Sequence, residues 1–162
     1  MRSIMVVAMG LAVAGCSDDV SGAAATFTAA LSGQKEIPVV AGSQNGVATC
    51  TVASPNVSCT VTFAGLSGAP TAMHIHAGNA NQTGSTNGPV RVDLCGAGTA
   101  LACPTTTSGT FAAGNRTVIA GTTFTFDSLN DRMHNYGLYV NVHTTANTGG
   151  EMRGQLFRPV AP

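Results

Sequence analysis

Three histidines in this chain are spaced so that their side chains can meet at one point. His74 and His76 lie two residues apart in a run of strand-forming residues, and alternate side chains of a strand point to the same face. His143 ends a second run in which apolar and polar residues alternate. If these two strands are neighbours, the three imidazoles converge. Neutral imidazole binds zinc, copper, iron and nickel, and three nitrogen ligands would leave one coordination position open.

The same histidines can also form a structural cluster that needs no metal. Glu151 and Arg153 alternate on one face of a later strand, so that a carboxylate and a guanidinium stand side by side. Hydrogen bonds among these side chains and the histidines would hold the strand ends and satisfy buried polar atoms. Recognition of some other ligand is a third interpretation. The candidate metals are copper and zinc, and the fourth histidine, His134, is interpreted as a surface residue.

The sequence lacks the common motifs for nucleophilic catalysis and for phosphate binding. It contains neither a Gly-x-Ser-x-Gly nucleophile motif nor a glycine-rich phosphate-binding loop. Only 9% of the residues are charged, and lysine and arginine do not cluster, so nucleic acid is not an expected partner. This composition favours a non-enzymatic binding module, whose partner would be a protein or a glycan, over an enzyme.

The start of the chain predicts export. A single cation, Arg2, precedes an apolar run too short to span a bilayer, and small residues then lead to Cys16. This resembles the lipobox of bacterial lipoproteins, which implies a signal peptide over residues 1–15, a lipidated Cys16 and a tether over residues 16–25. Ser17, next to the lipidated cysteine, favours the outer membrane over the inner one. We therefore expect a membrane-anchored lipoprotein, periplasmic or on the cell surface.

The cysteines fit an oxidising compartment. The chain has five of them, and lipidation of Cys16 leaves an even set of four. Three pairings of the four are possible on paper, and local spacing favours Cys50 with Cys59 and Cys95 with Cys103. No CxxC pair is present, which disfavours metal binding by thiolates.

Residues 46–63 make the strongest local prediction. Folding this segment about its central proline as a hairpin places Cys50 opposite Cys59 and Val52 opposite Val57, all on one face. Serine and threonine occupy the other face. One register therefore satisfies both the apolar pattern and the disulfide, which would stabilise the fold by about 2.7 kcal/mol in the chain-entropy model.

The rest of the chain is also rich in short strands and turns. One domain over residues 26–160 is expected to be all-β, an antiparallel Ig-like or Greek-key sandwich joined by disulfides. The further strand candidates are residues 26–31, 71–76, 90–94, 109–112, 122–126, 138–143 and 151–157.

One short helix is predicted between the last strands. Ser128 would cap its start with Asp131 as a weak capping-box partner, and Gly137 would end it. Leu129 and Met133 are four residues apart and would pack one side of the helix against the sheets.

The segments named so far contain an ordered series of motifs. These are Phe27-Thr-Ala-Ala-Leu-Ser-Gly33 with Glu36-Ile-Pro38, Met73-His-Ile-His-Ala-Gly78, Asn87-Gly-Pro-Val90, Leu138-Tyr-Val-Asn-Val-His-Thr144 and Gly149-Gly-Glu-Met-Arg-Gly-Gln-Leu156. In this order they resemble the chordin-domain (CHRD) family over about residues 26–158. The resemblance implies an extracytoplasmic β-domain and does not imply a particular activity. The two cysteine pairs are additions to the usual pattern.

A second, fainter resemblance concerns the histidines alone. A His-x-His strand with a later Val-His near a Gly-Gly segment is similar to the copper ligands of Cu/Zn superoxide dismutase, another β-sandwich. The chain departs from that pattern because residues 78–91 contain no histidine that could bind zinc, and Asp93 is isolated. Arg153 is the candidate for the arginine that guides the substrate.

Overall fold

The computed structural model describes residues 24–78 and 87–159. The predicted signal peptide, Cys16 and nearly all of the predicted tether lie outside the described residues.

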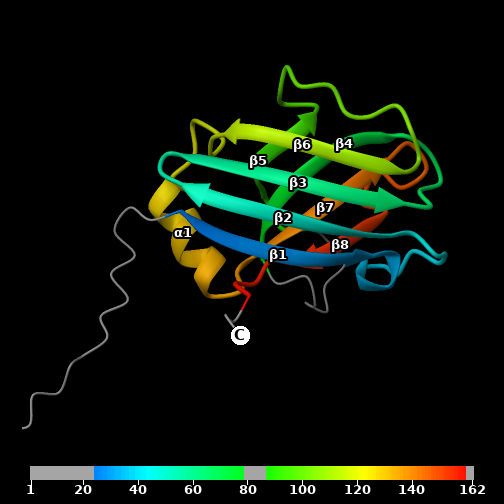
Figure 1. The fold of residues 1–162 in the computed structure, drawn as a ribbon, viewed down its shortest axis with the longest axis horizontal. Helices are drawn as coiled ribbons and strands as arrows, with labels where there is room; N and C mark the ends of the chain where they lie inside the picture. Colours follow the sequence, from blue (N-terminus) through cyan, green and yellow to red (C-terminus); the bar gives the residue numbers. More distant parts are fainter. Residues whose placement is uncertain (1–23, 79–86, 160–162) are drawn as a thin grey trace, which may run out of the picture.

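Within these ranges the chain forms one antiparallel sheet of eight strands, in the order β5-β4-β7-β8-β1-β2-β3-β6 (Figure 1). A 3-10 turn, η1, follows β1, and one α-helix, α1, precedes β7. The elements are β1 (Ala25–Ser32), η1 (Gly33–Lys35), β2 (Asn45–Ala53), β3 (Asn56–Ala64), β4 (Pro70–Ala77), β5 (Val90–Gly96), β6 (Gly109–Arg116), α1 (Phe126–His134), β7 (Leu138–Thr144) and β8 (Met152–Gln155).

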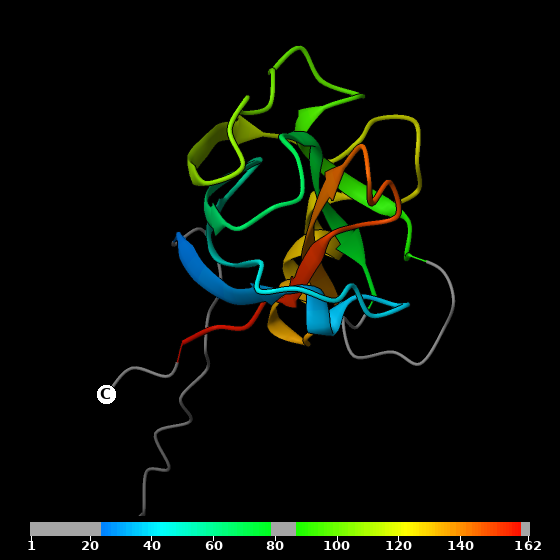
Figure 2. The same ribbon diagram turned by 90° about the vertical axis from the view of Figure 1, so that its right-hand side faces the viewer.

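The sheet folds over on itself, so that its two halves make the two layers (Figures 1 and 2). Its edge strands β5 and β6 approach each other, and the segment after β6 bonds to β5. The backbone N–H of Ile119 donates to the carbonyl of Arg91 at 2.9 Å, and Arg116 Nε donates to the carbonyl of Asp93 at 2.9 Å. The sheet is therefore nearly closed. This confirms the predicted all-β antiparallel class.

The hydrophobic core lies between the two layers and is built by the two-residue period of the strands. Phe27 on β1, Val61 on β3, Ile75 on β4 and Val140 on β7 are fully buried, while β1 to β3 turn threonines outward. Full burial of each such aliphatic or aromatic side chain stabilises the fold by about 1.5–3 kcal/mol.

The predicted hairpin register is confirmed. Cys50 faces Cys59 and Val52 faces Val57 in the β2–β3 ladder. The Cys50–Cys59 disulfide lies in the core, and the second predicted bridge joins Cys95 at the end of β5 to Cys103. Both predicted pairings are therefore present.

The helix is present, but its predicted start was wrong. Thr125 rather than Ser128 is the N-cap, and its side-chain oxygen accepts the backbone N–H of Ser128 at 3.2 Å. The predicted strand over residues 122–126 was wrong for the same reason, because its threonines lead into this cap instead of a sheet. Leu129 and Met133 are buried as predicted. The helix ends at His134, before Gly137, whose N–H donates to the Arg132 carbonyl at 2.7 Å.

Among the described residues, no helix has the length and apolar character needed to span a lipid bilayer.

Candidate metal-binding site

The three histidines meet on the outer face of the sheet, opposite the core. β4 and β7 are paired so that His74 faces Asn141 and Ala72 faces His143. Their neighbours along the strands, such as Met73 and Val142, point into the core and are fully buried. Because side chains alternate, the same pairing that builds the core brings the three imidazoles together.

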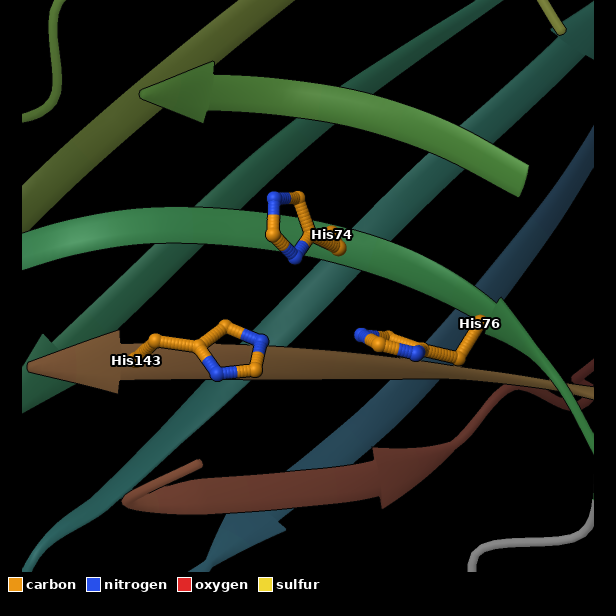
Figure 3. A group of neighbouring side chains, drawn as sticks. All are labelled: His74, His76 and His143. Atoms are coloured by element: carbon orange, nitrogen blue, oxygen red, sulfur yellow. The ribbon is translucent and has the colours of Figure 1, made fainter. Parts of the chain in front are cut away.

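The three rings point toward a common centre (Figure 3). Ring centroids are 4.9 Å apart for His74 and His143, 5.5 Å for His74 and His76, and 5.7 Å for His76 and His143. One ring nitrogen from each lies within 4.8 Å of the other two. Three nitrogens at about 2.1 Å from one tetrahedral ion lie about 3.4 Å from one another, so metal binding would require these ring nitrogens to close by up to about 1.4 Å.

Loops cover this outer face and orient two of the rings. His76 Nδ1 lies 2.6 Å from the carbonyl oxygen of Gly88, and His143 Nδ1 lies 3.0 Å from that of Thr148. A carbonyl can only accept, so both Nδ1 atoms carry the hydrogen and both Nε2 atoms have a lone pair. These two Nε2 atoms are buried and have no hydrogen-bond partner among residues 24–78 and 87–159.

In His74 the roles of the two ring nitrogens are reversed. Its Nε2 lies 3.5 Å from Asp93 Oδ1, and the nearby backbone of Ala97 acts to raise the pKa of the ring. Its Nδ1 is buried and finds no partner in the part of the chain that the structure describes. The donor set is therefore Nδ1 of His74 with Nε2 of His76 and of His143.

Burial keeps these imidazoles neutral. It lowers the pKa of His76 to about 4, with His143 and His74 adding to the effect, and it lowers the pKa of His143 to about 4, with His74 adding to the effect. Burial also lowers the pKa of His74. Metal ligands must be deprotonated, so the cluster is ready to bind a cation near neutral pH without releasing protons.

The glycine of the Asn-Gly-Pro motif, Gly88, is needed for steric reasons. A Cβ atom at this position would lie 1.8 Å from the carbonyl oxygen of Ala77 at the end of β4. Only glycine therefore lets the loop come close enough for its carbonyl to reach His76. This role could have been read from the motif but was not predicted.

Arg153 lies next to the histidines but is already paired. Its Nε and one of its terminal nitrogens each lie 2.6 Å from Glu36 Oε2, and its guanidinium also donates to Asn87 Oδ1 at 2.6 Å. Arg153 and Glu36 are both 2% exposed. Burial raises the pKa of Glu36, and the neighbouring guanidinium opposes this shift. Sequence reasoning missed Glu36 and Asn87 as partners, although both lie in the quoted motifs.

Glu151 does not join the histidines. Its carboxylate accepts the backbone N–H and the hydroxyl of Ser67, both at 2.6 Å, the hydroxyl of Thr144 at 2.5 Å and the amide of Asn147 at 3.1 Å. Burial alone would raise the pKa of Glu151, but these hydrogen bonds outweigh it and lower the pKa. Glu151 therefore ties two loops together and is not paired with Arg153.

The interpretation of His134 as a surface residue was wrong. Its ring is half-buried against Phe27, with ring centroids 5.1 Å apart. It lies on α1 and is not part of the three-histidine cluster.

The fold and the site define a disulfide-bonded antiparallel β-domain with a buried three-histidine cluster on one outer face. The family model of the CHRD domain matches residues 27–156, and the chain belongs to this family. At a coarse level, this membership indicates a non-enzymatic module. No curated protein matches the chain, and no solved structure matches it either.

Proposed function

We propose that this chain is a transition-metal-binding module in which His74, His76 and His143 hold copper or zinc. One observation carries the proposal. Three buried imidazole nitrogens converge without a hydrogen-bond partner among the described residues, while the other nitrogen of each ring faces an acceptor oxygen. An acceptor on the second ring nitrogen is the arrangement that orients histidine ligands in metal sites.

A purely structural polar cluster explains this arrangement less well. In such a cluster the ring nitrogens would bond to one another or to Glu151 and Arg153, but both of these side chains have other partners. A buried polar atom without a partner costs about 1–3 kcal/mol. A bound cation would use all three lone pairs at once and offset this cost.

The donor set suits both candidate metals. Three neutral nitrogens with an open fourth position fit zinc, and imidazole also suits copper. The four cysteines within the domain are bridged in pairs, so they offer no thiolate to the site. Solvent can reach the cluster at His74, whose side chain is 13% exposed.

Superoxide dismutation is not supported by the surroundings of the site. Arg153, the candidate guiding arginine, is buried and its charge is neutralised by Glu36. It is therefore not free to attract a small anion from solvent.

We further propose that the module is exported and anchored by a lipid on Cys16, at the outer membrane or cell surface. The two disulfides of the domain support an oxidising compartment, and Cys16 accounts for the odd cysteine. A protein or glycan partner stays a prediction of the sequence.

Metal analysis of the purified protein tests the site. We expect near-stoichiometric copper or zinc in the wild type after anaerobic purification and reconstitution with each metal. A His74→Ala/His76→Ala variant should lose it, whereas the control His134→Ala should keep it. A wild type that takes up neither metal, or a double variant that loads like the wild type, would show the proposal to be wrong.

A further inference from the structure

The orientation of His74 depends on a loop that a disulfide closes. The other two rings are held by the carbonyls of Gly88 and Thr148, which lie in open loops. His74 instead faces Asp93 on β5, whose Oδ1 lies 3.5 Å from its Nε2, and it lies near the backbone of Ala97, which follows directly after β5. Residues 96–102, here called the staple loop, lie between Cys95 and Cys103 and are closed by their bond.

The staple loop is also ordered from within. The backbone N–H of Gly96 donates to the carbonyl of Leu101 at 2.9 Å, and that of Thr99 donates to the carbonyl of Gly96 at 3.1 Å. The Thr99 hydroxyl accepts the N–H of Leu101 at 3.2 Å. These bonds fix the path of the backbone around Ala97.

The staple loop packs directly against the carboxylate of Asp93. Gly98 has φ +92°, and a Cβ atom there would lie 2.4 Å from Asp93 Oδ2. Glycine is thus required both for the backbone conformation and for this close approach. Arg116 braces the arrangement, since its Nε donates to the Asp93 carbonyl at 2.9 Å and its guanidinium also bonds to the Thr99 hydroxyl.

We propose that Asp93 and the disulfide-closed staple loop are positioning elements of the metal site, which hold His74 with Nε2–H outward and the Nδ1 lone pair toward the other two rings. This inference rests on the proposed function. Asp93 Oδ1 is an acceptor close to Nε2, and the staple loop packs against this carboxylate, so together they favour one tautomer and one ring orientation. Without them, the ring can rotate or shift its proton, and the third donor is lost.

The tautomer can be measured without any metal. In the metal-free wild type near pH 7, the ¹⁵N chemical shifts of His74 should report hydrogen on Nε2 and a bare Nδ1. Asp93→Ala and the double variant Cys95→Ala/Cys103→Ala should each give a mixture of tautomers. The double variant Cys50→Ala/Cys59→Ala is the matched control, because it removes a disulfide of similar sequence separation, 9 against 8, on the other half of the sheet. Its His74 signals should match those of the wild type.

Competition titration with a chelator then measures affinity for copper and for zinc. We expect Asp93→Ala and Cys95→Ala/Cys103→Ala to bind about 10–100-fold more weakly, and the control pair to stay within about twofold of the wild type. Circular dichroism checks that each variant is folded. If the Cys95→Ala/Cys103→Ala variant does not fold, Asp93→Ala alone tests the positioning role.

The two proposals fail in different ways. If the wild type binds neither metal, the proposed function is wrong, and the tautomer of His74 still tests the positioning role. If the wild type binds metal but the Asp93 and Cys95/Cys103 variants keep the wild-type tautomer of His74 and the wild-type metal affinity, the positioning role is wrong. Equal losses in the Cys50/Cys59 control would also overturn it, because the effect would then reflect general destabilisation.

Discussion

His76 and Tyr139 stack face to face at paired positions of β4 and β7, with ring centroids 5.1 Å apart and planes 10° apart. The Tyr139 hydroxyl accepts the backbone N–H of Gly88 at 2.9 Å, and the Gly88 carbonyl lies 2.6 Å from His76 Nδ1. One strand pair and one loop residue therefore fix both the plane and the tautomer of His76.

The stacking predicts different effects for two substitutions of Tyr139. Tyr139→Phe keeps the ring but loses the two hydrogen bonds of the hydroxyl, from the Gly88 N–H and to Asn87 Oδ1, so it should lower the free energy of unfolding by about 1–2 kcal/mol and leave metal affinity nearly unchanged. Tyr139→Ala removes a buried ring and should cost about 3–5 kcal/mol and weaken metal binding. Denaturant unfolding and chelator competition measure both quantities. Equal affinities for the two variants would argue against a role of the stack.

Gly88→Ala should weaken the proposed metal site although it changes none of the three histidines. The added methyl group meets the Ala77 carbonyl and must push the loop away from β4, which removes the acceptor of His76 Nδ1. We expect weaker metal binding together with a lower melting temperature. The control is Gly114→Ala on β6, where a Cβ atom has no neighbour within 4 Å and φ is not positive. A Gly88 variant with the same affinity as this control would contradict the prediction.

The metal-free protein should lose stability in mild acid. Burial lowers the pKa of His76 and His143 to about 4, whereas an unfolded histidine titrates near about 6.5. Between these values the unfolded chain binds more protons, so the free energy of unfolding falls as the pH decreases from about 6.5 to about 4. Urea unfolding at pH 7 and pH 5 measures the loss. The variant His76→Asn/His143→Asn should show a smaller loss, and an equal loss would assign the effect to other groups.

Replacing only one partner of the Glu36–Arg153 pair should strongly destabilise the fold. Glu36→Gln or Arg153→Met leaves one buried charge without its partner, and we expect each to lower the free energy of unfolding by about 3–5 kcal/mol. The double variant should recover part of the loss, because no unpaired charge remains. Denaturant unfolding of the four proteins forms a double-mutant cycle. Additive losses would show that the two side chains do not act as a pair.

Replacement of Cys16 tests the proposed anchor. Cys16→Ala removes the thiol that would carry the lipid, so the protein should move from the membrane fraction to the soluble fraction. Fractionation followed by detection of the mature chain measures this. Unchanged partitioning would reject lipidation at this residue.

The residues that were predicted well are those whose position follows from the two-residue period of a strand. Cys50 and Cys59 had one register that also satisfied the apolar pattern, and His74 and His76 had to share a face. The partners of the histidines could not be predicted in this way. Gly88, Thr148 and Asp93 come from loops or from a strand whose pairing only the folded chain reveals.

Each of the main errors has a physical cause. Thr125 was included in a predicted strand because threonine favours strands, but here its hydroxyl caps α1, a role that depends on where the chain leaves the sheet. Glu151 and Arg153 stand in the same strand segment and were expected beside the histidines. Their partners Ser67 and Glu36 lie more than 80 residues away along the chain, which no local pattern can indicate.

The histidines and the core occupy opposite faces of β4 and β7. Met73, Ile75 and Val142 belong to the hydrophobic core, whereas His74, His76 and His143 lie outside it. Substitutions of the three histidines therefore leave the core-facing side chains of both strands unchanged. Loss of the proposed metal site should therefore leave the sheet and its core in place.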